Sequence, residues 1–453
     1  KGLTQRVLRE SVKAALADCW ERDMPETLPA AMLSKYALCE RRLAVRHAHF
    51  PSNADILRTA LRRLQFENLL YYLSAVEVEK QERARQNGVS FQTAGTLERF
   101  LTRLPFAPTD AQTRSMGEIS RDMAGRAPMN RLLQGDVGSG KTIVAMYALW
   151  VAMENGFQGA LLAPTEILAR QHYEQARALF GRRAVLLTGS MGAAAEREAL
   201  EKVENGEGGC VVGTHALLQP NVRFHRLGMV VTDEQHRFGV EQRASLQEKG
   251  TRPDVLVMSA TPIPRTLALL AFADLDVSLL DELPPGRLPV KTRVISREKR
   301  MDMYAYIARQ ARNGMQAYVV CPFIEDSDSL DSPSAESLYR ELKRKLPDTR
   351  IFLLHGRQTE EKKRAVMDAF LLGEGDVLVS TTVIEVGVHV ENACFMVVEG
   401  ADRFGLSQLH QLRGRVGRSS RQAYCFLLTD NEGEGAERRM RILCETTDGF
   451  AIA

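Results

Sequence analysis

The chain has 453 residues, of which 44% are hydrophobic and 26% are charged. At roughly 100 to 200 residues per domain, this length predicts two to four globular domains and excludes a disordered tail. Lys and Arg total 60 against 57 Asp and Glu, and the net charge of +3 neither indicates nor excludes a nucleic-acid partner.

The longest apolar run, Ile143 to Met153, falls short of the roughly 20 residues that cross a bilayer, and the first 20 residues lack the apolar core of a secretory signal. We therefore expect a cytoplasmic protein with no membrane contact. Seven cysteines are scattered along the chain without a CxxC pair, which disfavours zinc fingers and a disulfide scaffold.

The first hundred or so residues have a helical pattern. Between Asp55 and Arg85 apolar residues recur at helical spacing and charged residues fill the other positions, which predicts one long amphipathic helix. Residues 1–104 carry 17 Lys and Arg against 12 Asp and Glu, so the basic excess of the chain lies here. A solvated helical face is the simpler interpretation, and a surface that faces nucleic-acid phosphates is the alternative.

From about residue 131, short apolar runs alternate with helical stretches, as in parallel sheets covered by helices on both faces. The runs form two series, 132–133, 159–163, 184–187, 210–213, 229–232 and 255–259, then 294–295, 317–321, 351–354, 377–380, 395–398 and 424–428. The Pro-rich segment 281–289 is the expected linker, and the acidic, Ser-rich segment 325–334 an exposed loop. We predict an α/β fold with a helical segment at 1–105, domains at 106–283 and 284–430, and a further element at 431–453.

Residues 135–142 read GDVGSGKT, which fits the phosphate-loop pattern G-x-x-x-x-G-K-[ST] between an apolar run and a helical stretch. Glycines let backbone N–H groups close on phosphate oxygens, and the helix N-terminus adds partial positive charge. Lys141 is expected to neutralise the β- and γ-phosphates, and Thr142 to offer its hydroxyl to Mg²⁺. A Gly-rich turn with a surface lysine is the alternative. The predicted ATP-binding loop comprises Gly135, Asp136, Val137, Gly138, Ser139, Gly140, Lys141 and Thr142.

Two adjacent carboxylates, Asp233 and Glu234, end the apolar run MVVT. Downstream of a phosphate loop, Asp233 is placed to hold the Mg²⁺ shell and Glu234 to orient or deprotonate the attacking water. An Asp-Glu pair at a strand end is by itself more often a solvated loop. The preceding phosphate loop favours the catalytic interpretation.

The order GDVGSGKT, APTEILA, VVGTHALL, DEQH, MSATP, VLVSTTVIEVGV and QLRGRVGR resembles the motif order of superfamily 2 helicases. The stretches DEQHRFGVEQR, MSATPIPRTLAL, DELPPGR and RFGLSQLHQLRGRVGR are similar to the bacterial RecG family, over nearly the whole chain. This resemblance implies two tandem RecA-like motor domains, ATP and Mg²⁺, and a monomer. It further implies helicase activity on branched or forked DNA in recombination and repair.

The resemblance also implies residue roles. Gln112 matches the residue that reads adenine, and Ser259, Ala260 and Thr261 match the motif that couples hydrolysis to domain movement. From the second domain, Gln411, Arg415 and Arg418 match residues that reach the nucleotide across the cleft. With Lys141, Asp233 and Glu234 they form the expected catalytic set. A basic loop that touches phosphate backbone or solvent is the alternative for GRVGR at 414–418.

Small polar residues in the remaining matching motifs are implied to contact DNA, where backbone amides and short side chains suit sugar-phosphate groups. Taken singly, each is more often an ordinary cap or loop residue. They are Thr165, Arg170, Gly189, Thr214, His215, His355, Gly356, Thr381 and Thr382.

The chain departs from the RecG pattern in two respects. His389 stands where relatives usually carry Asp, which is either a tolerated substitution or a change in a charge-dependent contact. From the resemblance we also expect that the N-terminal wedge domain and the C-terminal continuation of RecG proteins are not in this sequence. We therefore expect Mg²⁺-dependent ATP hydrolysis with weak DNA stimulation and poor fork unwinding. The alternatives are a duplex translocase similar to the transcription-repair coupling factor and an ATP-gated nucleic-acid binding module without unwinding. The segment RFGVEQR disfavours an RNA helicase.

Overall fold

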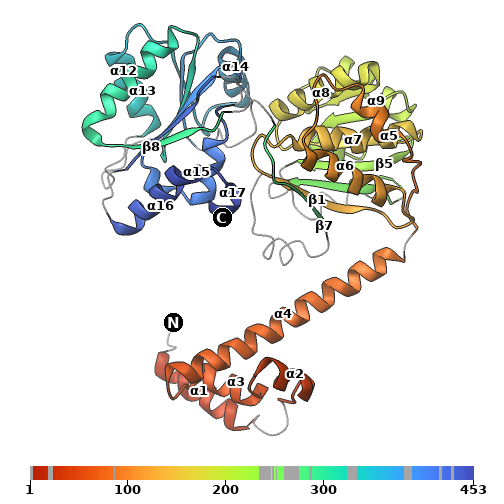
Figure 1. Cartoon of the computed structure of the whole chain (residues 1–453), viewed down its shortest axis with the longest axis vertical. Helices are drawn as coiled ribbons and strands as arrows, with labels where there is room; N and C mark the ends of the chain where they lie inside the picture. Colours follow the sequence, from red (N-terminus) through yellow and green to blue (C-terminus); the bar gives the residue numbers. More distant parts are fainter. Residues whose placement is uncertain are drawn as a thin grey trace. The chain divides into compact units, whose positions relative to one another are not determined.

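The computed structural model describes residues 4–18, 24–85, 87–233, 246, 249–250, 252–259, 275–284, 288–323, 334–381, 390–417, 421–429 and 433–452. They belong to two compact units, Lys1–Glu82 and Arg83–Ala453 (Figure 1). Among the described residues, no helix is both long and apolar enough to cross a membrane.

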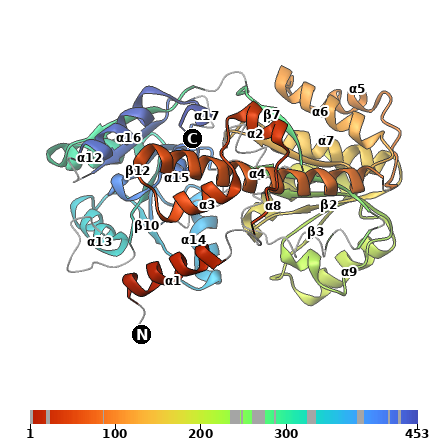
Figure 2. The same ribbon diagram turned by 90° about the horizontal axis from the view of Figure 1, so that it is seen from below.

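The first unit is helical, with α1 (Gln5–Asp18), α2 (Ala30–Tyr36), α3 (Arg41–His49) and α4 (Ala54–Ala84). The 31-residue α4 confirms the predicted long helix, and α2 and α3 lie along it (Figure 2). Arg63 of α4 is fully buried and donates to Glu26 Oε1 at 2.6 Å and Glu67 Oε2 at 2.7 Å. A buried guanidinium is tolerated here because two carboxylates compensate its charge.

The second unit begins with a parallel sheet in the order β3-β4-β2-β5-β6-β1-β7. Its strands are β1 (Asn130–Gly135), β2 (Gln158–Leu162), β3 (Ala184–Leu187), β4 (Cys210–Gly213), β5 (Leu227–Asp233), β6 (Asp254–Ser259) and β7 (Asp276–Leu280). Its described helices are α5 (Thr96–Leu101), α6 (Asp110–Met123), α7 (Lys141–Glu154), α8 (Glu166–Phe180) and α9 (Ala193–Glu204). Every residue of α7 from Val144 to Met153 is buried, because this helix packs between α5, α6 and the sheet.

A second parallel sheet follows in the order β10-β11-β9-β12-β13-β8. Its strands are β8 (Lys291–Ile295), β9 (Gln316–Val320), β10 (Ile351–Leu354), β11 (Val377–Ser380), β12 (Ala393–Val398) and β13 (Tyr424–Leu428). Its described helices are α12 (Arg300–Ala311), α13 (Ala335–Lys345), α14 (Glu360–Leu371), α15 (Leu406–Arg413), α16 (Glu434–Glu445) and α17 (Gly449–Ile452). We call the parts built on these two sheets the first and second domains.

The two domains share a structural detail that marks them as copies of one architecture. Gln158 begins β2 and its Nε2 donates to two backbone carbonyls of segment 203–208, at 2.9 and 2.7 Å. Gln316 begins β9 and its Nε2 donates to two carbonyls of segment 370–375, at 2.7 and 2.8 Å. In each case the glutamine holds by hydrogen bonds the loop that precedes the neighbouring strand, β4 in the first domain and β11 in the second.

Each predicted apolar run coincides with a strand, except that Ala163 and Cys321 lie one residue beyond β2 and β9. The predicted fold class is confirmed. Strand β7 was not among the predicted strands, and only its Ser278 and Leu280 are buried. The domain boundaries at 105, 283 and 430 stay predictions, although Phe91 and Phe100 already pack in the core of the first domain. Most of the predicted loop 325–334 lies outside the described residues.

Candidate functional site

The loop between β1 and α7 holds the predicted phosphate-binding residues. Gly138 and Gly140 adopt φ angles of +81° and +82°, in the left-handed region that favours glycine. A Cβ at position 140 would overlap the Nε2 of Gln112. Lys141 Nζ donates to the carbonyls of Gly135 at 2.7 Å and Asp136 at 2.9 Å, so the ammonium group lies inside the curve of the loop.

Gln112 lies in the first turn of α6 and is 2% exposed. Its Oε1 accepts from the backbone N–H of Thr109 at 3.0 Å, while the Thr109 hydroxyl accepts from Gln112 N–H, which completes a capping box. Its Nε2 donates to the carbonyl of Ser139 at 2.9 Å. Gln112 therefore fixes the start of α6 against the loop 135–142.

A cavity of about 740 Å³, which we call the loop cavity, opens beside this loop. This volume suits a ligand of nucleotide size. Many of the predicted site residues line it, as do residues that the sequence did not single out, including the exposed Phe106 and the buried His172. The lining residues used below are Phe106, Gln112, Gly138, Gly140, Lys141, Thr142, His172, Asp233 and Arg415.

Asp233 ends β5 and lines the loop cavity together with Thr142. A hydroxyl and a carboxylate are hard oxygen ligands of the kind Mg²⁺ prefers, so this pair fits the expected metal. The Asp233 Oδ2 lies 2.8 Å from Nε2 of His172, which comes from α8. The available sequence signal was a histidine on the buried face of an amphipathic helix, four residues after Leu168.

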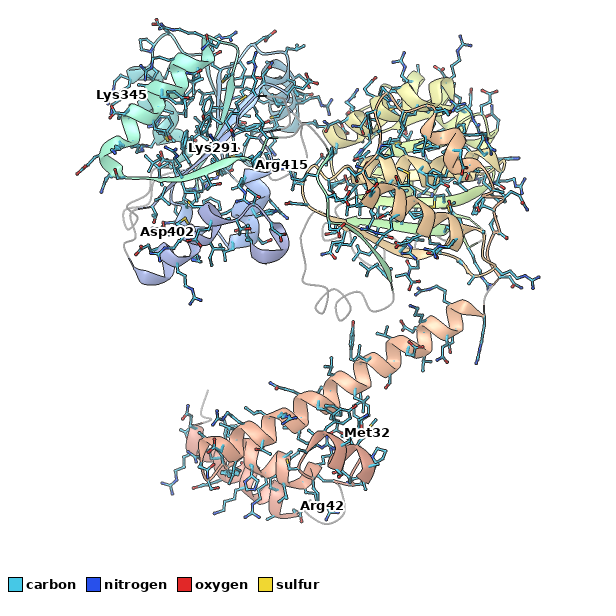
Figure 3. The ribbon with its side chains drawn as sticks, viewed as in Figure 1. Met32, Arg42, Lys291, Lys345, Asp402 and Arg415 are labelled. Atoms are coloured by element: carbon cyan, nitrogen blue, oxygen red, sulfur yellow. The ribbon has the colours of Figure 1, made fainter. Side chains whose placement is uncertain are left out.

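Arg415 belongs to the second domain (Figure 3), and it lines the loop cavity. It follows α15 and is 4% exposed. Gly414 explains the close approach, because a Cβ at that position would lie 2.6 Å from the Cβ of Val137. Gln411 lies in α15 but does not line the loop cavity. Both domains thus contribute to one cavity.

A second contact joins α15 to the loop 135–142. His410 Nε2 lies 2.6 Å from Asp136 Oδ1, and its Nδ1 lies 2.8 Å from Arg413 Nη2. Arginine can only donate hydrogen bonds, so Nδ1 of His410 accepts one from Arg413. Nε2 of His410 therefore carries the hydrogen atom and donates a hydrogen bond to Asp136. Burial raises the pKa of Asp136, but hydrogen bonds from His410 and the Val137 amide outweigh it, and the pKa lies below its ordinary value.

The residues predicted to contact DNA follow the carboxyl ends of five strands. They come after β2, β3 and β4 in the first domain and after β10 and β11 in the second. In the loop cavity, the residues of the loop 135–142 follow β1, Asp233 ends β5, and His172 lies on α8, which follows β2. In the second domain, α15 follows β12. The loop 135–142 and Asp233 thus belong to other strands than the predicted DNA contacts, whereas α8 carries both Arg170 and His172.

The structure shows the hydrogen-bond partners or the burial of several residues predicted to contact DNA. The Thr165 hydroxyl caps α8 by accepting from Leu168 N–H at 3.4 Å. The Thr214 hydroxyl is buried without a hydrogen-bond partner in the described part of the chain, whereas Arg170 and His215 are exposed. His355 Nε2 lies 3.8 Å from a Glu336 carboxylate oxygen.

The domains also meet on this side. Arg364 of α14 donates to Glu166 of α8 at 2.6 Å, and Glu166 accepts from the backbone N–H of Ser190 at 3.0 Å. Ile167 packs against the core of the second domain.

Ser259 ends β6 and is buried. The predicted residues Glu234, Ala260, Thr261, Thr382 and Arg418, and also His389, lie outside the described residues.

Comparison with known proteins agrees with this arrangement. Residues 109–270 match the DEAD/DEAH box helicase family and residues 298–420 match the helicase conserved C-terminal domain. The structure of Mss116p bound to single-stranded RNA shares the fold, with a TM-score of 0.58 at 19% identity over 78% of this chain. Fold and cavity together define a two-domain RecA-like helicase motor.

Relatives with higher identity narrow this class. The chain is 46% identical to ATP-dependent DNA helicase RecG of Streptococcus pneumoniae, covering 100% of this chain and 68% of that protein, and 46% identical to RecG of Synechocystis, of which it covers 55%. A structure of RecG bound to a three-way DNA junction matches with a TM-score of 0.83 at 42% identity, covering 100% of this chain and 60% of that one. The chain belongs to the RecG family of ATP-dependent DNA helicases.

Proposed function

We propose that this chain is an ATP-driven DNA motor that hydrolyses ATP in the loop cavity and acts on branched DNA such as replication forks and recombination intermediates. The observation that carries the proposal is the joint lining of this cavity by Lys141, Thr142 and Asp233 of the first domain and Arg415 of the second. A nucleotide bound there would contact both domains, so its hydrolysis would change how they are held together.

The loop 135–142 is proposed to bind the phosphates. Its backbone N–H groups and the α7 N-terminus provide positive electrostatic potential, and Lys141 would exchange its bonds to the Gly135 and Asp136 carbonyls for bonds to phosphate oxygens. Thr142 and Asp233 would hold Mg²⁺, which when bound neutralises charge on the phosphates. This exchange makes the lysine available without moving the helix.

Hydrolysis is proposed to need groups from both domains. Glu234, next to Asp233, would orient or deprotonate the attacking water. Arg415 would stabilise the charge that develops on the γ-phosphate, with Gln411 and Arg418 from the same motif. Ser259, Ala260 and Thr261 would transmit the change to the sheet. Because Arg415 belongs to the second domain, full stabilisation requires that the domains approach each other.

The base of the nucleotide is proposed to lie beside Phe106 and Gln112. Phe106 lines the loop cavity and its side chain is largely exposed, so its ring face is available to stack on an adenine. The Gln112 amide is already fixed between Thr109 and Ser139, which would hold it at a constant distance from the base edge.

DNA is proposed to run across the residues that follow β2, β3, β4, β10 and β11. Short polar side chains and backbone amides at these positions would grip the sugar-phosphate backbone independently of base sequence. They are Thr165, Arg170, Gly189, Thr214, His215, His355, Gly356, Thr381 and Thr382. Branched DNA is the favoured partner because the RecG structure with a TM-score of 0.83 holds a three-way junction. We also propose that the chain acts as a monomer in the cytoplasm.

Phosphate release tests this proposal. The rate should require Mg²⁺ and should fall to background in Lys141→Ala, because the phosphates lose their neutralising ammonium group. A matched control is Lys343→Ala, which removes an exposed lysine on α13 of the second domain. Adding a three-way junction tests the choice of partner. Hydrolysis by the Lys141→Ala variant at the unaltered rate would refute the site.

A further inference from the structure

His172 is the ionisable group in the loop cavity that the proposed hydrolysis leaves without a role. It lies on α8, two turns from the helix N-terminus, and is 5% exposed. Its Nε2 lies 2.8 Å from Oδ2 of Asp233, which ends the neighbouring strand β5. Leu168 and Ala176, four residues before and after, are buried on the same face of the helix, so packing fixes the ring in place.

The direction of this hydrogen bond follows from the carboxylate. An ionised Asp only accepts hydrogen bonds, so Nε2 of His172 must carry a hydrogen atom and be the donor of this hydrogen bond. The ring's Nδ1 is buried and has no hydrogen-bond partner among the residues that the structure describes. The contact to Asp233 is therefore the polar interaction in the described chain that holds this imidazole.

We propose that His172 is a positioning residue that orients the Asp233 carboxylate for the Mg²⁺ that accompanies ATP. The proposal rests on the nucleotide site proposed above. By engaging Oδ2, the imidazole fixes the rotation of the carboxylate group, and with it the direction of Oδ1. Asp233 would then receive the metal without losing rotational freedom at that moment. Outer partners of metal-binding carboxylates commonly act in this way.

The test is the Mg²⁺ dependence of nucleotide binding, measured with a fluorescent ADP analogue and independent of turnover. His172→Leu removes the donor while retaining an apolar side chain for the surrounding core. We expect the Mg²⁺ concentration for half-maximal binding to rise about 10- to 100-fold. His172→Gln retains a donor at the end of a side chain of similar length and should return the Mg²⁺ requirement to within a few-fold of the original. Binding in excess EDTA should be the same in all variants.

Two further variants make the result decisive. Glu174→Gln changes the exposed face of the same helix and should leave the Mg²⁺ requirement unaltered. His172→Asn keeps a polar group too short to reach Asp233, so it should behave like His172→Leu and replaces it if the leucine variant does not fold. In an Asp233→Asn background, His172→Leu should have no additional effect on the Mg²⁺ requirement.

The outcomes separate the two proposals. If the unaltered chain does not bind the ADP analogue, the proposed nucleotide site is wrong. If it binds the analogue equally with and without Mg²⁺, Asp233 holds no metal there and the positioning role is overturned. If the unaltered chain responds to Mg²⁺ and the folded His172→Leu and His172→Asn variants respond at the same concentrations, the positioning role is overturned. A purely structural histidine would lower the melting temperature without moving the Mg²⁺ requirement, and that pattern also overturns it.

Discussion

His410 of the second domain donates a hydrogen bond to Asp136 of the first, with 2.6 Å between Nε2 and Oδ1. His410 is 2% exposed, and Arg413 occupies its other ring nitrogen. Arg413 also donates to the carbonyls of Leu443 at 2.9 Å and Thr446 at 2.8 Å. A continuous series of hydrogen bonds therefore connects the loop 135–142 to the end of α16.

Replacing His410 should weaken the joined state of the two domains. His410→Leu removes a hydrogen bond to a charged acceptor, worth about 1.5 to 3 kcal/mol, so kcat/KM for ATP should fall about 10- to 100-fold. Asp136→Asn weakens the same bond, and the double variant should lose little more than either single variant. Steady-state ATP hydrolysis measures all three. Fully additive losses would show that the two side chains act separately.

Replacing Arg415 should affect turnover more than affinity. Arg415 lines the loop cavity from the second domain, where charge would develop on the γ-phosphate in the transition state. We expect Arg415→Ala to lower kcat by about a thousand-fold, with a much smaller change in nucleotide Kd. Arg312→Ala, which removes a largely exposed arginine of the same domain, is the control. A variant that loses affinity and keeps kcat would contradict the role.

Asp254 should make the first domain less stable as pH rises. Burial raises the pKa of this carboxyl to about 8, although the Met129 N–H donates to it at 2.7 Å. The unfolded carboxyl titrates near pH ~3.9, so folding favours the protonated form and its contribution declines as pH rises toward 8. Asp254→Asn removes this titration. The melting temperature of the variant minus that of the original chain should therefore increase between pH 5 and pH 8. A constant difference across this range would contradict the assignment.

Arg63 should be important for the stability of the helical unit. Arg63→Met leaves the carboxylates of Glu26 and Glu67 without their buried cation, which should cost about 3 to 5 kcal/mol. Hydrogen–deuterium exchange in α4 measures the loss as faster local opening. Arg58→Met, which removes an exposed arginine of the same helix, should change exchange little. Equal effects of the two substitutions would show that the buried ion cluster does not stabilise the unit.

The sequence was informative where chemistry and local structure coincide. Lys141, Thr142 and Asp233 could be located because a strand, a Gly-rich loop and a helix follow one another within a few residues. The strands were predicted because both faces of a parallel sheet are covered, which produces unbroken apolar runs. Strand β7 was missed because it lies at the edge of its sheet and buries only part of its length.

The partners of His172 and His410 could not be predicted from the sequence. His172 and Asp233 are 61 positions apart, and His410 and Asp136 are 274 positions apart. These pairings depend on which strands are neighbours and on how two domains meet, and a single sequence states neither. No residue spacing identifies the partner of a single histidine in a helix. A phosphate loop, by contrast, is identified by the fixed spacing of its glycines, lysine and threonine.

Because Gly414 has no side chain, the two domains can come closer together at the loop cavity than any other residue at this position would allow. A β-carbon there would lie 2.6 Å from the Cβ of Val137, closer than two such atoms can approach. Any other residue would act as a spacer and would keep Arg415, the next residue, at a greater distance from a bound γ-phosphate. The proposed role of Arg415 thus depends on the hydrogen atom that takes the place of a side chain at position 414.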